Sequence, residues 1–455
     1  MNCSLIWMVD MTKAKVGIVS LGCDKNRVDT EVMLYNLNKD GYEITADPAC
    51  ADVIIVNTCA FLQSARQEAI ETVLEMANFK QDGCKAVVVT GCLGQKFGDE
   101  VFDALYEADA VLGINDYDNI GKILDQVLAG KRIKQISDAN SGITFGNRIL
   151  TTKPHVAYLK LGDGCNNFCT YCLIPYIRGR FRSVEIDKLV SQAKQLVAGG
   201  VKELILVAQD VTRYGYDLYG EPRLVELLTE LEKIDGLEWI RLLYCYPELV
   251  TDKLIEKISS SDKVVNYIDV PLQHVDDKIL KKMNRRSSQA QIEALFDKLN
   301  SKGIQIRSTF ICGFPYETEQ THQTVADFLK KYNLRNVGFF PYSKEEGTAA
   351  AKFDCQVHYQ TKNRMVRNLY KIQHEVTNLN NIKDVGNTYK SVVDDFVEEN
   401  LDGYVYVGRT YFMAPEIDGV VYLHSKKPLE IGQFVDATVT NALEYDLIAQ
   451  VVEEE

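Results

Sequence analysis

The first part of the chain alternates short apolar runs with longer amphipathic stretches. The apolar runs are rich in β-branched residues, as expected of strands buried on both faces of a parallel sheet, and lie at 16–21, 53–57, 86–90 and 110–113. Helical periodicity appears between them, at 27–39, 62–79 and 117–129. Residues 15–130 are therefore predicted to form a small doubly wound α/β domain. The polar, glycine-containing stretch at 131–150 is predicted to be a linker.

Strand and helix patterns resume with longer periods over residues 151–382. The candidate strands are 156–161, 203–208, 239–244, 267–270, 304–311 and 337–340. Amphipathic helices are expected between them, among others at 187–198, 224–233, 254–259 and 289–302. Six such units predict a partial, TIM-like (β/α)6 barrel, whose chemistry would lie at the carboxyl ends of the strands.

The pattern changes again over residues 384–455, where five short alternating runs with glycine-bearing turns predict a five-stranded, OB-like β-barrel. Such barrels usually bind RNA through basic and aromatic residues. Here four Lys and Arg stand against fifteen Asp and Glu, a net charge of −11. Because RNA affinity depends on neutralised phosphates, this balance favours a basic protein surface as the partner. The alternative is that the charge only aids solubility.

Composition places the chain among globular proteins, with 455 residues, 46% hydrophobic residues and a formal charge of −13. No apolar run approaches the roughly 20 residues that span a bilayer. The opening residues 1–13 lack a basic region before their apolar patch, which argues against a secretory signal; Met11 could be the true start, and no fold role is assigned to this segment. Twelve scattered cysteines fit a reducing compartment, so the protein is predicted to be cytoplasmic.

The most specific chemical feature is a loop directly after the strand at 156–161. It contains Cys165, Cys169 and Cys172, three cysteines with the spacing Cys-x3-Cys-x2-Cys. A zinc site or an iron–sulfur cube needs four ligands, and the loop supplies three. Either a fourth ligand comes from elsewhere and the site is structural, or one iron stays open to bind a reactant. Paired ligand doublets, which zinc sites usually show, are missing from this loop.

Three further cysteines follow three of the predicted strands in the first domain, namely Cys23, Cys59 and Cys92. Since the carboxyl ends of parallel strands form one edge of the sheet, these thiols are predicted to converge on a second three-thiolate site. The simpler alternative is that they are small core residues. Cys50 and Cys84 lie near strand starts, at the opposite edge, and that simpler interpretation is preferred for them.

Other polar residues also stand at strand ends of the second domain. Gln209 follows the second strand and is predicted to contact a cofactor. Arg182 belongs to the basic run 178–182, which could engage a carboxylate or be a solvated loop. His274 could contact a cofactor or be a satisfied structural residue. Cys245, Cys312 and Cys355 have no spacing partners and are taken as structural.

The spacing of Cys165, Cys169 and Cys172, with an aromatic residue just before the last cysteine, resembles the radical S-adenosylmethionine (AdoMet) superfamily. The resemblance implies that these cysteines hold a [4Fe-4S] cluster and that its open iron chelates the methionine part of AdoMet. Tyr171 would then lie beside the adenine.

The order of three thiol-bearing strand ends, a radical-AdoMet loop and a terminal β-barrel resembles the methylthiotransferases from about Lys15 to the end of the chain. In that family the last module is called the TRAM domain. The run 19–26, Val-Ser-Leu-Gly-Cys-Asp-Lys-Asn, is similar to the RimO-type branch, which modifies ribosomal protein S12, as are the runs 208–215 and 342–348. Asp24 departs from the proline usual in that branch, which concerns the local turn and leaves the thiol in place.

The resemblance implies two [4Fe-4S] clusters and a transferase reaction. Sulfur associated with the cluster on Cys23, Cys59 and Cys92 would be methylated by one AdoMet. The second cluster would reduce another AdoMet to methionine and a 5′-deoxyadenosyl radical. That radical would take a hydrogen from the β-carbon of an aspartate in S12, and the carbon radical would accept the methylthio group. An electron donor such as a flavodoxin or ferredoxin is implied, while neither a membrane nor a nucleic acid is expected as the main partner.

Two alternative functions compete with this one. The same chemistry on tRNA adenosine would call for a basic terminal barrel, which the chain lacks. A two-cluster electron carrier would complete each ligand set with four cysteines, whereas each site here offers three.

Overall fold

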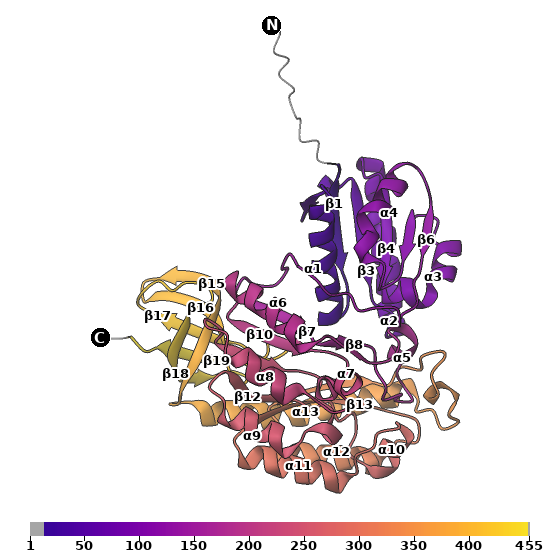
Figure 1. Ribbon diagram of the computed structural model, residues 1–455. Helices are drawn as coiled ribbons and strands as arrows, with labels where there is room; N and C mark the ends of the chain where they lie inside the picture. The colour runs from indigo at the N-terminus through magenta and orange to yellow at the C-terminus, as the bar shows by residue number, and fades with distance from the viewer. Residues whose placement is uncertain (1–12, 454–455) are drawn as a thin grey trace. The chain divides into compact units, whose positions relative to one another are not determined.

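The computed structural model describes residues 13–453, which form two compact units (Figure 1). The first comprises the described residues up to Thr151 together with Ile174–Gly179, and the second comprises residues 152–173 and those from Arg180 onward. No fold role was assigned to residues 1–13 from the sequence. All of these residues except Lys13 lie outside the described part of the chain. Within that part, no helix combines the length and the apolar character needed to cross a membrane.

The first unit is built on a parallel sheet of six strands in the order β2-β1-β3-β4-β5-β6. The strands are β1 (Lys15–Ser20), β2 (Glu43–Thr45), β3 (Val53–Thr58), β4 (Ala86–Gly91), β5 (Ala110–Leu112) and β6 (Ile133–Gln135). The helices are α1 (Asp24–Lys39), α2 (Gln63–Asn78), α3 (Cys92–Ala104) and α4 (Ile120–Leu128), with the short α5 (Ile174–Ile177) joining from later in the chain. The order changes direction at β1, which is the usual ligand-binding point of such sheets.

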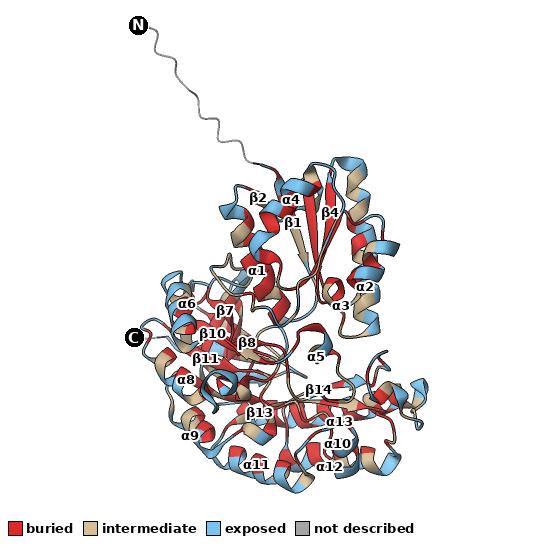
Figure 2. Ribbon diagram, turned by 45° about the vertical axis from the view of Figure 1, so that its right-hand side comes forward, coloured by how far each residue is buried: buried red, intermediate tan, exposed pale blue. Residues whose placement is uncertain are grey.

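Burial explains why these segments form a sheet. Every residue of β3 and β4 is buried, as their continuous apolar sequences predict (Figure 2). Alternate strand residues such as Val16, Ile55 and Val88 share one core with Met33 of α1 and Leu124 of α4. The helices α2 and α3 pack against β3, β4 and β5. The predicted doubly wound domain is confirmed.

Two short strands depart from the sequence interpretation. β2 was not predicted, and β6 lies inside the stretch 131–150 that was assigned to a linker. Each has only three residues and is half-buried or exposed, so neither shows the continuous apolar run of a central strand. The rest of that stretch also packs with the first unit, for example through the Thr144 hydroxyl, which donates to the Ile114 carbonyl oxygen at 2.8 Å.

The second unit contains the six-stranded parallel sheet expected of a partial barrel, in the order β14-β13-β12-β11-β10-β7. Its strands are β7 (Val156–Lys160), β10 (Glu203–Val207), β11 (Trp239–Leu242), β12 (Val264–Asp269), β13 (Gln305–Cys312) and β14 (Asn336–Pro341). A two-stranded ribbon of β8 (Gly162–Asp163) and β9 (Arg182–Ser183) follows β7. Figure 2 shows β7, β10 and β11 buried beneath helices with exposed outer faces.

Helices connect these strands, and a last helix, α13, leads from β14 to the terminal barrel. They are α6 (Ile186–Ala198), α7 (Tyr216–Tyr219), α8 (Leu224–Glu232), α9 (Asp252–Ser260), α10 (Asp277–Lys282), α11 (Gln289–Ser301), α12 (Glu319–Tyr332) and α13 (Tyr359–Asp384). The four helices that the sequence predicted explicitly are present, and their ends differ from the prediction by at most two residues. No explicit prediction was made for α12 or α13.

The chain ends in a closed five-stranded barrel, β15-β16-β17-β19-β18, which confirms the OB-like module. Its strands are β15 (Thr388–Asn400), β16 (Gly403–Thr410), β17 (Val421–Ser425), β18 (Phe434–Ala442) and β19 (Leu447–Val451). All pairs are antiparallel except β17 with β19.

A buried ionic network joins this barrel to the amino-terminal edge of the parallel sheet. Arg409 Nη1 of β16 lies 2.7 Å from Glu203 Oε2 of β10, and its Nε lies 2.6 Å from Asp394 Oδ2. Arg241 Nε pairs with the other oxygen of Glu203 at 2.8 Å, and His155 Nε2 lies 2.7 Å from Asp394 Oδ1. Burial opposes ionisation of Asp394, but the contacts with His155 and Arg409 outweigh it and lower its pKa to about 2. The barrel is therefore attached at the edge opposite to the carboxyl ends of the strands.

Candidate functional site

The structure brings Cys23, Cys59 and Cys92 together at one edge of the first sheet. They follow β1, β3 and β4, which are neighbours in the sheet. The approach of their loops is tight: a Cβ atom added to Gly22 would lie 2.9 Å from Cys59 Cβ and 3.4 Å from its Sγ. The three cysteine loops thus lie at one edge of the sheet, and a shared three-thiolate site there stays a prediction.

Asn26, the third residue of α1, ties the three cysteine loops to one another. Its amide nitrogen donates to the carbonyl oxygens of Leu21 at 3.0 Å and Thr58 at 2.9 Å, just before the Cys23 and Cys59 loops. Its side-chain oxygen accepts from Cys92 Sγ at 3.7 Å. A single buried side chain therefore fixes the positions of all three loops.

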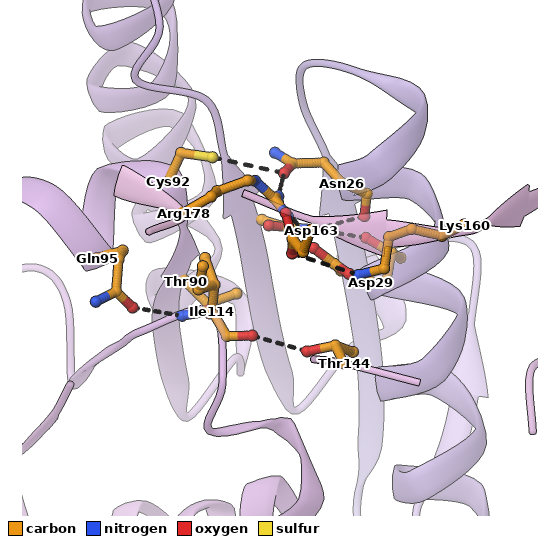
Figure 3. Close-up of polar contacts among 12 residues, drawn as sticks. Asn26, Asp29, Thr90, Cys92, Gln95, Ile114, Thr144, Lys160, Asp163 and Arg178 are labelled. Atoms are coloured by element: carbon orange, nitrogen blue, oxygen red, sulfur yellow. Dashed lines mark hydrogen bonds and ion pairs between the residues drawn. The ribbon is translucent and has the colours of Figure 1, made fainter. Parts of the chain in front are cut away.

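A buried arginine completes this group, as Figure 3 shows. Arg178 Nη2 donates to Asn26 Oδ1 at 2.5 Å and to Asp29 Oδ2 at 3.0 Å. The sequence interpretation of 178–182 as a run that engages a carboxylate applies to Arg178, whose carboxylate partner is Asp29 of the same unit. Arg180, in contrast, is exposed.

Burial increases across the three thiols. Cys23 is exposed, Cys59 is half-buried and Cys92 is buried. Burial raises the pKa of Cys59, and it raises the pKa of Cys92 to about 12, against the opposing effect of Arg178. Burial thus favours the protonated forms of Cys59 and Cys92, whereas binding to iron favours the thiolates.

The chemistry of the cysteine donors fits an iron–sulfur cluster. Among residues 13–453 all cysteines are free, and no group of three His, Cys, Asp or Glu side chains is arranged to hold one metal ion. The first site offers three thiols from separate loops, and thiolates are the ligands of [4Fe-4S] clusters. The second site likewise offers three thiols, those of Cys165, Cys169 and Cys172.

The second group of cysteines lies in the loop after β8. Gly164 and Phe168 have φ angles of +80° and +49°, and these left-handed residues fold the loop back on itself. The amide of Cys172 donates to the carbonyl oxygen of Cys169 at 3.0 Å. Cys165 and Cys169 are buried and Cys172 is half-buried. Burial raises the pKa of Cys165 to about 12, and a hydrogen bond from the Asn167 amide opposes this shift.

Gln209 and Arg182 lie beside the start of this cysteine loop. Gln209 Nε2 donates to Asp163 Oδ1 at 3.0 Å, and Arg182 pairs with Asp163 across the β8–β9 ribbon. The side-chain oxygen of Gln209 is buried without a hydrogen-bond partner, an arrangement that suits a residue awaiting a polar ligand. Arg182 Nη1 donates to the Arg180 carbonyl oxygen at 2.6 Å.

Tyr171 and His274 occupy apolar or buried positions in the same unit. The Tyr171 ring packs edge-on against Phe314, with 6.3 Å between the ring centroids. His274 is buried; its Nδ1 accepts from the Asp276 amide at 3.0 Å and its Nε2 lies 3.7 Å from Glu317. The neighbouring imidazoles of His274 and His322 outweigh the effect of burial and lower the pKa of Glu317 to about 2. His274 thus has a structural hydrogen bond at Nδ1, whereas its Nε2 is buried without a hydrogen-bond partner.

Sequence reasoning missed Tyr246 and Arg285. The Tyr246 hydroxyl lies 3.4 Å from Cys169 Sγ, and the Arg285 guanidinium lies 4.2 Å from the centre of the Tyr246 ring. Both line a cavity of about 220 Å³, whose walls are formed by Asn167, Arg213, Tyr216, Tyr246, Glu248, Leu249, Asn284, Arg285 and Arg286. The position of Tyr246 just after β11 was the one available signal, since catalytic groups of such barrels gather at strand ends.

Comparison with known families divides the chain in the same order. Residues 15–113 match an uncharacterized protein family, UPF0004. Residues 159–329 match the radical SAM superfamily, and residues 385–452 match the TRAM domain.

Among solved structures, the chain resembles a radical S-adenosylmethionine methyltransferase, TsrM, from Kitasatospora setae. The TM-score is 0.52 at 14% identity, over 71% of this chain and 72% of that one. This similarity concerns the fold alone.

Curated relatives match nearly the whole chain. The ribosomal protein uS12 methylthiotransferase RimO of Clostridium tetani is 46% identical over 447 residues, covering 98% of this chain and 99% of the relative. The proteins of the same name from Clostridium botulinum and Acetivibrio thermocellus are 47% and 45% identical, each over 99% of its length. The chain therefore belongs to the radical S-adenosylmethionine methylthiotransferases, in the ribosomal protein uS12 methylthiotransferase RimO family.

Proposed function

We propose that this protein methylthiolates the β-carbon of an aspartate in ribosomal protein uS12, the substrate named for its relatives, with AdoMet as co-substrate. The observation that carries this proposal is the match to those relatives over 98% of the chain, supported by two separate groups of three free cysteines. Each site would hold one [4Fe-4S] cluster with one iron left open.

Each of the two sites would be formed by its own set of three cysteines. Cys23, Cys59 and Cys92 would hold the first cluster, and Cys165, Cys169 and Cys172 the second. When bound, the clusters supply the sulfur-transfer and one-electron chemistry that no amino-acid side chain provides. The protein places the reactants and excludes water, and no general base is needed for removal of hydrogen from carbon.

Binding of AdoMet is assigned to residues around the second site. Gln209 would offer its unpaired side-chain oxygen, Tyr171 its ring and Arg182 its positive charge. The reductant would be a small electron-transfer protein such as a flavodoxin or ferredoxin, and the reaction is assigned to the cytoplasm.

The acidic barrel supports a basic protein as substrate. The outer half of β15, residues 395–400, pairs with β16 alone and is exposed, so the β15–β16 hairpin extends past the closed barrel. It presents Glu398 and Glu399 beside Phe396 and Val397, whose exposed fractions are 51% and 47%. Acidic and apolar side chains on one hairpin suit a basic protein surface better than RNA.

The test is the mass of the product. The anaerobically purified protein, incubated with reductant, sulfide, AdoMet and purified uS12, should add one methylthio group to a uS12 peptide that contains aspartate. Unfractionated tRNA is offered in a parallel reaction. Modification of tRNA adenosine with unmodified uS12 would favour the alternative methylthiotransferase, and two loaded clusters without modification of either substrate would favour an electron carrier.

A further inference from the structure

The segment that follows the second cysteine loop contributes a buried charge to the first unit. Ile174–Gly179 belongs to the first unit, where α5 packs against α3. Ile177 and Arg178 are exposed by only 0% and 1%. Burial of an unpaired arginine costs several kcal/mol of folding free energy, so the position of Arg178 indicates a specific role.

The partners of Arg178 connect it to all three thiols of the first site. Its guanidinium donates to Asn26 Oδ1, the same oxygen that accepts from Cys92 Sγ. The amide of Asn26 holds the carbonyl oxygens that precede the Cys23 and Cys59 loops. The positive charge of Arg178 also acts on both Cys59 and Cys92. The Arg178 side chain therefore orients Asn26 and places a cation beside the thiols.

Asp29 is the carboxylate that faces Arg178, at 3.0 Å. The pair is buried, with both side chains exposed by 1%. A buried charge is weakly screened, so a change in either partner alters the electrostatic potential felt by a cluster on these thiols.

We propose that Arg178 is a positioning residue for the first cluster, which fixes Asn26 between the three cysteine loops and raises the reduction potential of the cluster. Reduction adds negative charge, and a buried cation beside the thiolates stabilises the reduced state. This inference rests on the proposed function, since it requires a cluster on Cys23, Cys59 and Cys92.

The experiment isolates the first cluster in the full-length chain. A background variant with Cys165, Cys169 and Cys172 all changed to Ala removes the second site, and a redox titration followed by electron paramagnetic resonance then reports on the first cluster alone. In this background Arg178→Gln is expected to shift the reduction equilibrium at least about tenfold toward the oxidised state, ~59 mV for a one-electron couple. Arg178→Lys keeps the positive charge and should shift the reduction potential by less than half as much as Arg178→Gln.

Two further variants separate charge from structure. Arg180→Gln makes the same change at an exposed position two residues away and should leave the potential unchanged. Asp29→Asn removes the opposing carboxylate and should shift the potential in the positive direction, opposite to Arg178→Gln. A structural role alone would not reverse the sign, and this variant also decides the question if Arg178→Gln fails to load iron.

The possible failures are distinct. An iron-free background variant with Arg178 intact would reject the cluster and with it the proposed function. Full iron content with the same potential in the parent, Arg178→Gln and Asp29→Asn variants would reject only the role of Arg178. Equal shifts for Arg178→Gln and Arg178→Lys would reject the charge effect.

Discussion

Gly91 shows at the level of one residue how closely the cysteine loops pack. It directly precedes Cys92, has a φ of +88°, and a Cβ atom there would lie 2.3 Å from Asn57 Oδ1 and 2.6 Å from the Thr58 carbonyl oxygen. Gly83 has a similar φ of +111° with no atom within 4 Å of the added Cβ. Gly83 lies in the left-handed helical region, with ψ of −5°, whereas Gly91 has ψ of −154°, a conformation that only glycine adopts readily. Gly91 therefore carries both the greater backbone strain and the collision.

Gly91→Ala should therefore destabilise the protein more than Gly83→Ala. At Gly83 the left-handed conformation costs an alanine about 1–2 kcal/mol. At Gly91 the glycine-only conformation together with the collision with buried backbone should bring the loss to at least about 3 kcal/mol. Denaturant unfolding under anaerobic conditions measures both variants, together with their iron content. Equal losses of stability in the two variants would mean that the segments of Gly91 and Thr58 can move apart without loss of folding free energy.

Individual site residues were predictable only where the sequence marks them. Cys23 and Cys59 stand directly after apolar runs, and the parallel sheet brings such positions together. Arg178 lies in the basic run 178–182 and Tyr246 shortly after a strand, but neither position reveals its partner, because Asn26 and Cys169 come from segments distant in sequence. Their contacts depend on tertiary packing that local patterns do not encode.

At the level of elements, strands buried on both faces were the most predictable. The run at β4, Ala-Val-Val-Val-Thr-Gly, is fully buried and matches the prediction closely. The long helix α13 was not named, since most of its residues are polar and its buried strip is narrow, with Met365, Leu369 and Val376 among its members. Short edge strands such as β2 were missed because three residues show no periodicity.

Attachment of the barrel to the sheet depends on buried charge rather than on surface pairs. Arg409→Met would leave Glu203 and Asp394 buried with a missing partner, and the expected loss is about 3–5 kcal/mol. Lys390→Met removes an exposed pair with Glu238 between the same two modules, and its expected loss is less than about 1 kcal/mol. Thermal unfolding of the two variants checks this difference. Similar melting temperatures would show that the buried network contributes no more than the exposed pair.

The whole molecule distributes its charge unevenly. Of a formal charge of −13, the last 72 residues contribute −11, so the rest of the chain is close to neutral. Net charge of this kind steers association with a partner of opposite sign and is screened by salt. In the proposed function the barrel would recruit the basic substrate, while the carboxyl edge of the parallel sheet carries the cysteine loop.

Reversal of charge on the exposed hairpin should weaken recognition of uS12. Glu398→Lys with Glu399→Lys is expected to raise KM for uS12 about tenfold at low salt with little change in kcat, because like charges repel across the interface. The difference should shrink as ionic strength rises. The matched control is Glu68→Lys with Glu75→Lys, an equal charge change on the exposed side of α2. An equal effect of both double variants would assign the loss to net charge rather than to the hairpin.

The central claim is that one chain holds two inorganic clusters, each on three thiols. Iron and sulfide content of the anaerobically reconstituted protein tests it most directly. Cys59→Ala and Cys169→Ala should each lose half of the iron and sulfide of the unmodified protein, and Cys84→Ala, which changes a buried cysteine outside both sites, should lose none. Full iron content in Cys59→Ala, or zinc in place of iron at either site, would contradict the account.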